Sequence, residues 1–376
     1  MSAPFTGFLS SERLRQLENM AAKRGLPVVE VEGKPFDMGE MSGRKCASKA
    51  KAYRASIAEN IEYSTGMGWA KAVERARLFL PYAEGFYPDF IEEIRGYASG
   101  AKMPFEDAFT LCCHELLSPL GFRGCTDMAF SGEATSDGHV LIGHNEDWSS
   151  DQLDTVVLLH GKPKGKPEFV TTSYAGLLPS SGMNSAGISL TGNALNPNDT
   201  RVGIPKVFPA RKVLEARRIG EALEYAMPAD RASSYNNICS DKNGEIFSLE
   251  GSATDFAVLY ALEGFLVHTN HYTSEKMQRF EASPSWISCS IVRYSRAMKL
   301  AESLVGHASV ETIAEAFRDH VNRPDSICRH ADPKLHRLDV SETIFSVIFD
   351  LTSLEAHVLK GHPCEMGGYA RFRLDG

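Results

Sequence analysis

Hydrophobic and polar positions divide the chain into two parts with different periodicities. Up to about residue 117, apolar residues recur at helical spacing, for example over residues 70–78 and 89–94. From Cys125 onward, short runs of apolar and β-branched residues predict strands, separated by the glycine-containing turns that hairpins favour. We therefore expect a mostly helical segment from about residue 10 to residue 117, followed by a part in which strands dominate.

Strands and helices alternate in the second part of the chain. Strands are expected over residues 155–159, 188–191, 245–249, 256–260 and 344–349, and helices over residues 210–216 and 296–301. A further hairpin is expected to begin at Cys125 and to return over residues 139–148 after a tight turn at Asp137-Gly138. This alternation predicts a mixed α/β fold with layers of sheet and helix.

The dipeptide Gly124-Cys125 lies at the boundary between the two parts. A cysteine thiol has a pKa of about 8.5 and usually needs a neighbouring base, and a free α-amine with a pKa of about 8 can supply one. Cleavage before Cys125 would place both groups on one residue. Glycine tolerates the unusual backbone that self-cleavage by an N-to-S acyl shift needs. Taken alone, however, a Gly-Cys pair is more often a turn beside a buried small side chain.

Several separated motifs, in order along the chain, make the pattern more specific. They are residues 31–39, 90–101, 124–126, 143–148, 183–187, 193–195, 268–271 and 326–329. Together they resemble the acyl-coenzyme A:6-aminopenicillanic acid acyltransferase (isopenicillin N acyltransferase) family of cysteine N-terminal nucleophile (Ntn) hydrolases, over nearly the whole chain. The resemblance implies an α/β fold of the Ntn-hydrolase type, a four-layer αββα sandwich. Residues 111–116 depart from the Asn-x-Arg-Thr-Glu stretch common in the family, so the pocket is expected to differ.

The resemblance also implies a reaction sequence. The chain would cut itself between Gly124 and Cys125, giving a small subunit of residues 1–124 and a catalytic large subunit of residues 125–376. The two are expected to remain associated as one domain, because neither part alone closes the core. The Cys125 thiolate would then attack an amide or thioester carbonyl, and the acyl group on sulfur would pass to water or to an amine.

Four further residues are assigned roles by the resemblance. Asn270 is expected to donate to the oxyanion, and Asp147 to hold the cysteine amine or orient the substrate. Arg329 would bind a substrate carboxylate or Asp147, and Ser326 would contribute a hydroxyl to the same pocket. The alternatives are an asparagine in a turn and a structural salt bridge at Arg329. Glu146 is expected to be structural, because neighbours along a strand point to opposite faces.

Composition restricts the class of protein without naming a function. The 376 residues are 43% hydrophobic and 23% charged, as in ordinary globular proteins. The net charge of −8 argues against general binding to nucleic acid or anionic membranes, and no apolar run approaches the roughly 20 residues of a membrane helix. The N-terminus lacks the basic and apolar blocks of a secretory signal, so a cytoplasmic location is expected.

The cysteines and histidines do not predict a metal site. Eight cysteines are scattered without regular spacing, which suggests neither a disulfide framework nor a zinc ribbon. His268 and His271 would point to opposite faces of an extended segment and are expected to be structural. The chemistry outlined above requires neither a metal ion nor an organic cofactor, and none is expected.

The leading hypothesis is an autoprocessing N-terminal-cysteine amidohydrolase that cleaves an N-acyl amide of a small molecule through a thioester. One alternative is an acyltransferase that moves an acyl group from acyl-coenzyme A or an amide to an amine. Another is a non-catalytic binding protein on the same fold. The expected partners are the small substrate and the two cleaved fragments themselves, without nucleic acid or membrane; a homo-oligomer is left open.

Overall fold

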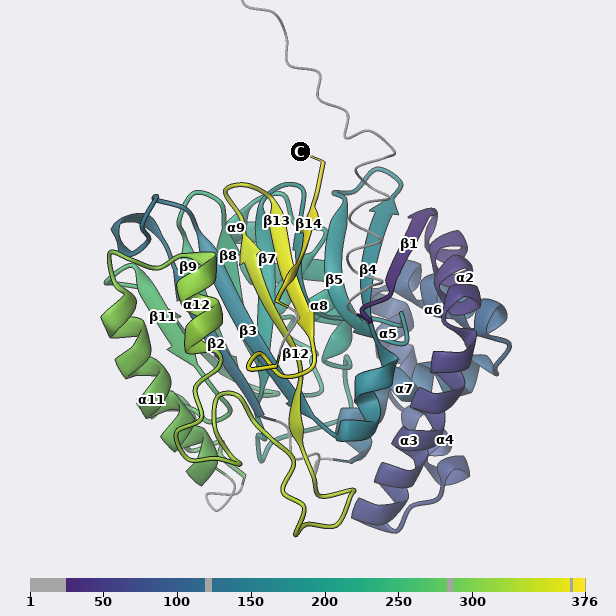
Figure 1. Ribbon diagram of the computed structural model, residues 1–376. Coiled ribbons are helices and arrows are strands. Elements are labelled where there is room, and N and C mark those ends of the chain that lie inside the picture. Colours follow the sequence, from purple (N-terminus) through teal and green to yellow (C-terminus); the bar gives the residue numbers. More distant parts are fainter. Residues whose placement is uncertain (1–24, 119–123, 283–286, 366–367, 376) are drawn as a thin grey trace, which may run out of the picture.

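Two β-sheets lie face to face in the computed structural model, which describes residues 25–118, 124–282, 287–365 and 368–375 (Figure 1). The larger sheet has the strand order β1 (Val28–Gly33), β4 (Val156–Pro163), β5 (Phe169–Tyr174), β6 (Pro179–Asn184), β7 (Ile188–Ala194), β8 (Tyr235–Asp241), β9 (Ile246–Gly251) and β10 (Phe256–Tyr260). The smaller sheet has the order β11 (Phe265–His268), β2 (Gly124–Phe130), β3 (Leu141–Trp148), β12 (Glu342–Asp350), β13 (Glu355–Lys360) and β14 (Ala370–Arg373).

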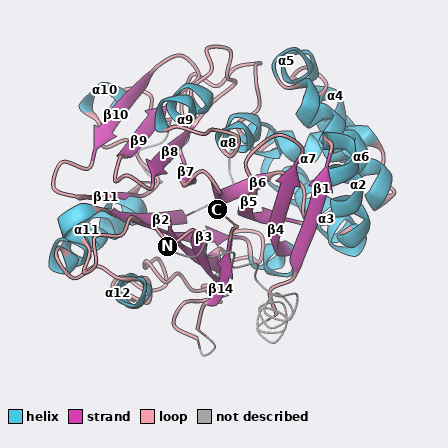
Figure 2. Ribbon diagram, turned by 90° about the horizontal axis from the view of Figure 1, so that it is seen from above, coloured by secondary structure: helices cyan, strands magenta, loops and turns pink. Residues whose placement is uncertain are grey.

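Helices cover both outer faces of the paired sheets. The helices α8 (Val207–Val213) and α9 (Ile219–Ala226) pack on the larger sheet, and α11 (Ser288–Leu304) and α12 (Val310–Ala316) pack on the smaller one. Figure 2 shows these two pairs on opposite sides of the stacked sheets. A short helix, α10 (Glu275–Gln278), lies near β10. The predicted four-layer αββα sandwich is therefore confirmed.

The remaining helices gather beside β1 at one side of the molecule (Figure 1). They are α2 (Pro35–Lys45), α3 (Ala47–Thr65), α4 (Trp69–Ala76), α5 (Leu80–Phe86), α6 (Pro88–Ala101) and α7 (Phe105–Leu117). Glycines let α2 and α6 approach closely. A Cβ atom on Gly39 would lie 1.8 Å from the carbonyl oxygen of Glu93, and one on Gly96 would lie 2.0 Å from that of Phe36. This contact explains the glycines in the two motifs at residues 31–39 and 90–101.

The parts before and after Gly124 share one sheet and one core. The strand β1 pairs in parallel with β4, whereas the other strand pairs among the described residues are antiparallel. The largest hydrophobic cluster joins Tyr53 and Ile94 from the first part with Val156 and Phe345 from the second. Burial of these side chains in a common core favours continued association of the two parts if the chain is cut between them.

The strands predicted from the sequence are present, but the turn predicted within the first hairpin is wrong. The strands β2 and β3 pair antiparallel, and residues 131–140 connect them with a 3-10 turn at Gly132–Ala134. Asp137-Gly138 lies inside this longer connection. The first part of the chain, expected to be mostly helical, opens with a strand, β1. The part of the expected helical segment over residues 10–24 lies outside the described residues.

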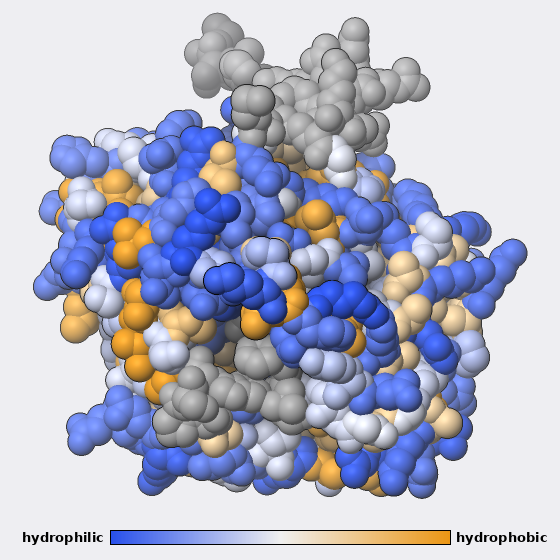
Figure 3. All heavy atoms as spheres, turned by 60° about the horizontal axis from the view of Figure 1, so that its bottom comes forward, coloured by the Kyte–Doolittle hydropathy of each residue, from blue (hydrophilic) through white to orange (hydrophobic). Residues whose placement is uncertain are grey.

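No helix in the described part of the chain is long and apolar enough to cross a membrane. On the face shown in Figure 3, hydrophilic residues predominate and hydrophobic ones are scattered among them. Scattered surface hydrophobics of this kind are normal in globular proteins and need no partner.

Candidate active site

Cys125 is the second residue of β2 and is held through both of its backbone groups. Its N–H donates to Asn270 Oδ1 at 2.7 Å, and its carbonyl oxygen accepts from Arg293 Nη1 at 2.5 Å. Arg293 comes from α11 and is 1% exposed; it also donates to Thr126 Oγ1 at 3.1 Å. The two peptide groups that flank Cys125 are therefore held by side chains from distant parts of the chain.

The orientation of the Asn270 amide follows from its neighbours. Both the Cys125 N–H and Arg293 Nη2, which lies 2.8 Å from Asn270 Oδ1, are donors, so the amide must turn its oxygen toward them. The Asn270 Nδ2 donates instead to the carbonyl oxygen of Ala194 at 3.1 Å. In this arrangement Asn270 is an acceptor for the cysteine nitrogen. Its donation to an oxyanion stays a prediction.

Gly124 is closely surrounded by the ends of three charged side chains. A Cβ atom there would lie 2.5 Å from Asp147 Oδ2, 2.8 Å from Arg329 Nη1 and 3.3 Å from Arg293 Nη2. Thr343 Oγ1 donates to Asp147 Oδ1 at 2.6 Å. Burial raises the pKa of Asp147 to about 6, although both arginines act to lower it. Asp147 and Arg329 therefore surround the residue that precedes the expected cleavage site.

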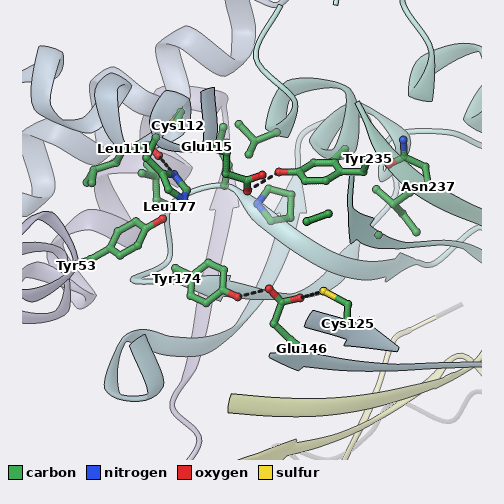
Figure 4. A pocket seen from close by; sticks show the side chains of 18 residues that line it. Tyr53, Leu111, Cys112, Glu115, Cys125, Glu146, Tyr174, Leu177, Tyr235 and Asn237 are labelled. Carbon is green, nitrogen blue, oxygen red and sulfur yellow. Dashed lines mark hydrogen bonds between the residues drawn. The ribbon is translucent and has the colours of Figure 1, made fainter. Parts of the chain in front are cut away.

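A chain of buried hydrogen bonds runs from the Cys125 thiol. The sulfur lies 3.4 Å from Glu146 Oε2, which lies 2.9 Å from His144 Nε2, and His144 Nδ1 lies 2.6 Å from Asp127 Oδ1. The hydroxyl of Tyr174 donates to the other Glu146 oxygen at 2.8 Å. Figure 4 shows Tyr174, Glu146 and Cys125 in this order. Glu146, expected to be structural, thus contacts the candidate nucleophile.

Burial and neighbouring charges determine which groups in this series of hydrogen bonds carry a proton. Burial raises the pKa of the Cys125 thiol, and the carboxylates of Glu146 and Asp147 raise it further, while the Ala194 backbone N–H opposes them. Burial alone would lower the pKa of His144, but Asp127 and Glu146 outweigh it and raise that pKa to about 10. At neutral pH the thiol is therefore protonated and donates to Glu146, while His144 is an imidazolium. Glu146 is placed to accept the thiol proton.

A pocket opens in front of Cys125 and Glu146. It encloses about 760 Å³ when all the space between its lining atoms and at its open mouth is counted. Its lining includes Cys112, His114 and Glu115 of α7, which belong to the stretch that departs from the family pattern. Glu115 accepts from the Tyr235 hydroxyl at 2.7 Å (Figure 4). It also pairs with Lys206 at 3.5 Å. The departure from the family therefore falls on the pocket wall.

The structure brings most of the predicted site residues together. Gly124, Cys125, Asp147, Asn270 and Arg329 meet at the start of β2. Ser326 does not join them through its hydroxyl, which donates to the carbonyl oxygen of Cys328 within its own loop. Asp147 and Arg329 lie against Gly124 and are not among the residues that line the pocket.

Sequence reasoning missed His144, Asp127 and Arg293. The pairing of β2 with β3 could have indicated His144 and Asp127. Cys125 pairs with Glu146 across the two strands, and Asp127 pairs with His144. Residues two apart on a strand share a face, so all four side chains lie on one side. Arg293 gave no such signal, since its contacts span more than 160 positions of sequence.

Among the described residues, two separate groups of side chains could each hold a metal ion. Within each group, the potential ligand atoms lie within 4.8 Å of one another. One is Cys125, His144 and Glu146, whose atoms are joined by the hydrogen bonds described above. The other consists of three residues from the loop after α12 and one that follows β13: His320, Cys328, His330 and Cys364. His268 and His271 do not converge: His268 pairs with Glu250 at 2.9 Å, and His271 bonds Ser290 Oγ at 2.8 Å.

The two facing sheets covered by helices form a fold of the Ntn-hydrolase class, and a buried thiol lies at the start of β2. The sequence matches the family "Acyl-coenzyme A:6-aminopenicillanic acid acyl-transferase" over residues 134–364. This match covers more than half of the chain, and the chain belongs to that family.

Individual relatives carry the names of both acyltransferases and hydrolases. The 40 kDa form of acyl-coenzyme A:6-aminopenicillanic-acid-acyltransferase from Emericella nidulans is 26% identical over 345 residues, which cover 89% of this chain and 92% of the relative. The β-alanyl-dopamine/carcinine hydrolase of Drosophila melanogaster is 24% identical over 224 residues, which cover 53% of this chain and 57% of the relative. The solved structure of a conjugated bile acid hydrolase mutant from Clostridium perfringens matches with a TM-score of 0.49 and 13% identity, covering 66% of this chain and 92% of that one.

Proposed function

We propose that this protein is an autoprocessing cysteine amidohydrolase that cleaves an N-acyl amide of a small molecule. The observation that carries the proposal is the position of Cys125. Its sulfur faces a pocket and hydrogen-bonds Glu146, while its nitrogen, held by Asn270, directly follows a glycine at which a Cβ atom would lie 2.5 Å from Asp147 Oδ2. A nucleophile that becomes the new N-terminus would carry its own base.

Self-cleavage would begin at the Gly124 carbonyl. Glu146 takes the proton from the Cys125 thiol, and the sulfur attacks the carbonyl carbon of Gly124. The Cys125 nitrogen takes up a proton as its bond to that carbon breaks, which leaves a thioester. Water then hydrolyses the thioester and frees a carboxylate at Gly124, together with the thiol and α-amine of Cys125. Arg293 and Asn270 would hold the Cys125 backbone throughout.

Turnover would repeat the same steps on the substrate. The freed α-amine, next to Asn270 Oδ1, accepts the thiol proton and passes it to the leaving amine as the acyl group moves to sulfur. The Ala194 N–H, which acts to lower the pKa of the Cys125 thiol, would donate to the oxyanion. The Asn270 amide would be a second donor once it turns from the Ala194 carbonyl. One good donor at such a position is worth about 3 kcal/mol of barrier.

Arg329 and Asp147 would contact the acyl part of the substrate. The same sulfur attacks the Gly124 carbonyl and the substrate carbonyl, so the substrate acyl group must occupy the place of Gly124 once that residue moves away. Arg329 Nη1 and Asp147 Oδ2 border this place, which supports recognition of a polar or carboxylate-bearing acyl group. The Ser326 hydroxyl would join them only by leaving its bond to Cys328.

Acyl transfer to an amine remains the second candidate function. The name of the Emericella relative supports it, whereas that of the Drosophila relative supports hydrolysis of a β-alanyl amide. The non-catalytic alternative has less support, since a pure binding protein does not need a thiol bonded to a carboxylate in its pocket. We favour hydrolysis because self-cleavage already requires water to open a thioester at Cys125.

The experiment is an acid quench of the purified protein during reaction with a panel of N-acyl amides, including β-alanyl and acylated amino acid amides. The expected result is a large fragment beginning at Cys125 whose mass is increased by the acyl group, together with released amine. Cys239→Ser, at a buried thiol outside the pocket lining, is the control and should still acylate. Added free amine that diverts the acyl group into a new amide would select transfer over hydrolysis. Amine release with no adduct, undiminished in Cys125→Ala, would contradict the proposal.

A further inference from the structure

Four potential metal-ligand atoms converge where the loop between α12 and β12 meets the segment that follows β13. Residues 317–341 contain no helix or strand, and this loop carries His320, Cys328 and His330. Cys364, which follows β13, completes the group, and all four ligand atoms lie within 4.8 Å of one another. Long loops without regular structure usually need some other means of fixing their course.

The separations between these atoms fit a tetrahedral zinc site. The two Nε2 atoms of His320 and His330 lie 3.0 Å apart, and His330 Nε2 lies 3.6 Å from Cys328 Sγ and 3.4 Å from Cys364 Sγ. Around a tetrahedral zinc ion with bonds of about 2.0 Å to nitrogen and about 2.3 Å to sulfur, two nitrogens lie about 3.3 Å apart and a nitrogen and a sulfur about 3.5 Å apart.

Hydrogen bonding alone does not account for this convergence. One ring nitrogen carries either a single hydrogen or a single lone pair, yet His330 Nε2 contacts three partners. A cation at the centre of the four atoms would satisfy all of them at once. The His362 ring stacks on the His330 ring and restricts its orientation. The ring centroids lie 4.2 Å apart, and the angle between the ring planes is 11°.

We propose that His320, Cys328, His330 and Cys364 bind one zinc ion. Two thiolates with two imidazoles are a preferred donor set of structural zinc. On binding, both thiols release their protons to solvent and form sulfur–zinc bonds, with no change in oxidation state. Cys328 is buried, whereas His320 is exposed and the other two ligands are partly exposed, so an ion can reach the site from solvent.

The ion would tie the loop to the end of β13 and thereby fix Arg329. This arginine lies between the ligands Cys328 and His330, and its guanidinium reaches toward Gly124 on β2. Zinc at this site would therefore hold the arginine that borders Gly124, where the proposed function places the substrate acyl group, without touching the substrate. Residues 317–341 should exchange amide hydrogens more slowly when zinc is bound.

The test is the zinc content of the full chain after reduction, treatment with a chelator, loading with zinc sulfate and removal of free metal. We expect one zinc ion per chain in the wild type and background levels in Cys364→Ser and His320→Gln, both changed at positions accessible to solvent. The matched controls, Cys289→Ser and His307→Gln, have similar exposure and should keep the ion. Cys125→Ala should also keep it, which excludes the thiol in the pocket as the ligand.

A second measurement identifies the donor atoms. Loading with cobalt should give a thiolate-to-cobalt charge-transfer band that is weakened in Cys364→Ser and unchanged in Cys289→Ser. The proposal is wrong if the reduced wild type takes up no zinc, if Cys364→Ser and His320→Gln bind as much as the wild type, or if the zinc-loaded protein contains a Cys328–Cys364 disulfide.

Discussion

Replacement of Gly124 by alanine should uncouple self-cleavage from folding. The added Cβ would lie 2.5 Å from Asp147 Oδ2 and 2.8 Å from Arg329 Nη1, whereas ordinary contacts of a Cβ atom begin at 3.4 Å. The two side chains, or the backbone of Gly124, must therefore move by about 0.6 to 0.9 Å. Overpacking of this kind typically costs about 1–3 kcal/mol of stability.

The effect on the reaction should exceed the effect on stability. A displacement of about 1 Å between reacting groups lowers rates by about 100-fold, so we expect Gly124→Ala to cut itself about 100-fold more slowly than the wild type. The assay is a time course of intact mass from the moment of synthesis, with thermal unfolding measured in parallel. Gly85→Ala, at a helical glycine with no atom within 4 Å of the added Cβ, is the control and should cut normally. A folded Gly124→Ala chain that cuts at the wild-type rate would refute this account of Gly124.

Three other substitutions follow from the same geometry. Glu146→Gln removes the acceptor of the thiol proton and should slow self-cleavage by at least about 100-fold; an unchanged precursor half-life in mass spectrometry would exclude Glu146 as the base. His144 has a folded pKa of about 10, above its unfolded value of about 6.5, so its stabilisation is complete below pH 6.5 and is lost as pH rises toward 10. In the uncut Cys125→Ala background, His144→Asn should therefore lose much more stability in urea at pH 6 than at pH 10, and an equal loss would contradict this. Gly39→Ala should destabilise by about 3 kcal/mol, because its Cβ meets backbone at 1.8 Å, whereas Gly85→Ala should not; equal melting temperatures would contradict it.

The sequence predicted the helices and strands well because the spacing of apolar residues that marks a helix or a strand can be recognised within a short stretch of chain. The strands after Cys125 and the helices before it follow directly from this spacing. The turn was mistaken because residues near Asp137 find partners elsewhere: the Ser131 N–H bonds Gly264, and the Ser136 N–H bonds Ala308. These distant contacts, which no local pattern reveals, keep residues 131–140 out of a tight hairpin.

The Glu146 contact was missed because Asp147 was expected beside Cys125, which would place Glu146 on the opposite face of the strand. The mistaken turn also changes the register of the two strands. A two-residue turn at Asp137-Gly138 would set residue 136 opposite residue 139, and Cys125 would then face Ser150. In the structure Cys125 faces Glu146. The register of a hairpin depends on the length of its connection, so the thiol's neighbour could not be deduced from the strand pattern alone.

The residues that surround Cys125 from a distance had no sequence signal of their own. Arg293 lies on a helix far along the chain, and Asn270 was found only through a resemblance to known motifs. Cys364 lies far from His320, Cys328 and His330 in sequence, and no regular spacing relates the four. Such sites are created by tertiary packing, which brings together residues that the chain order separates.

The most direct test of self-cleavage is the intact mass of freshly purified wild type beside Cys125→Ala, with N-terminal sequencing of the larger fragment. We predict that the wild type yields two fragments that stay associated, the larger beginning at Cys125, and that Cys125→Ala remains whole. A wild type that is folded yet stays a single chain through prolonged incubation would contradict the central claim. A cut at the same bond in Cys125→Ala would contradict it as well, since the thiol would then have no part in the reaction.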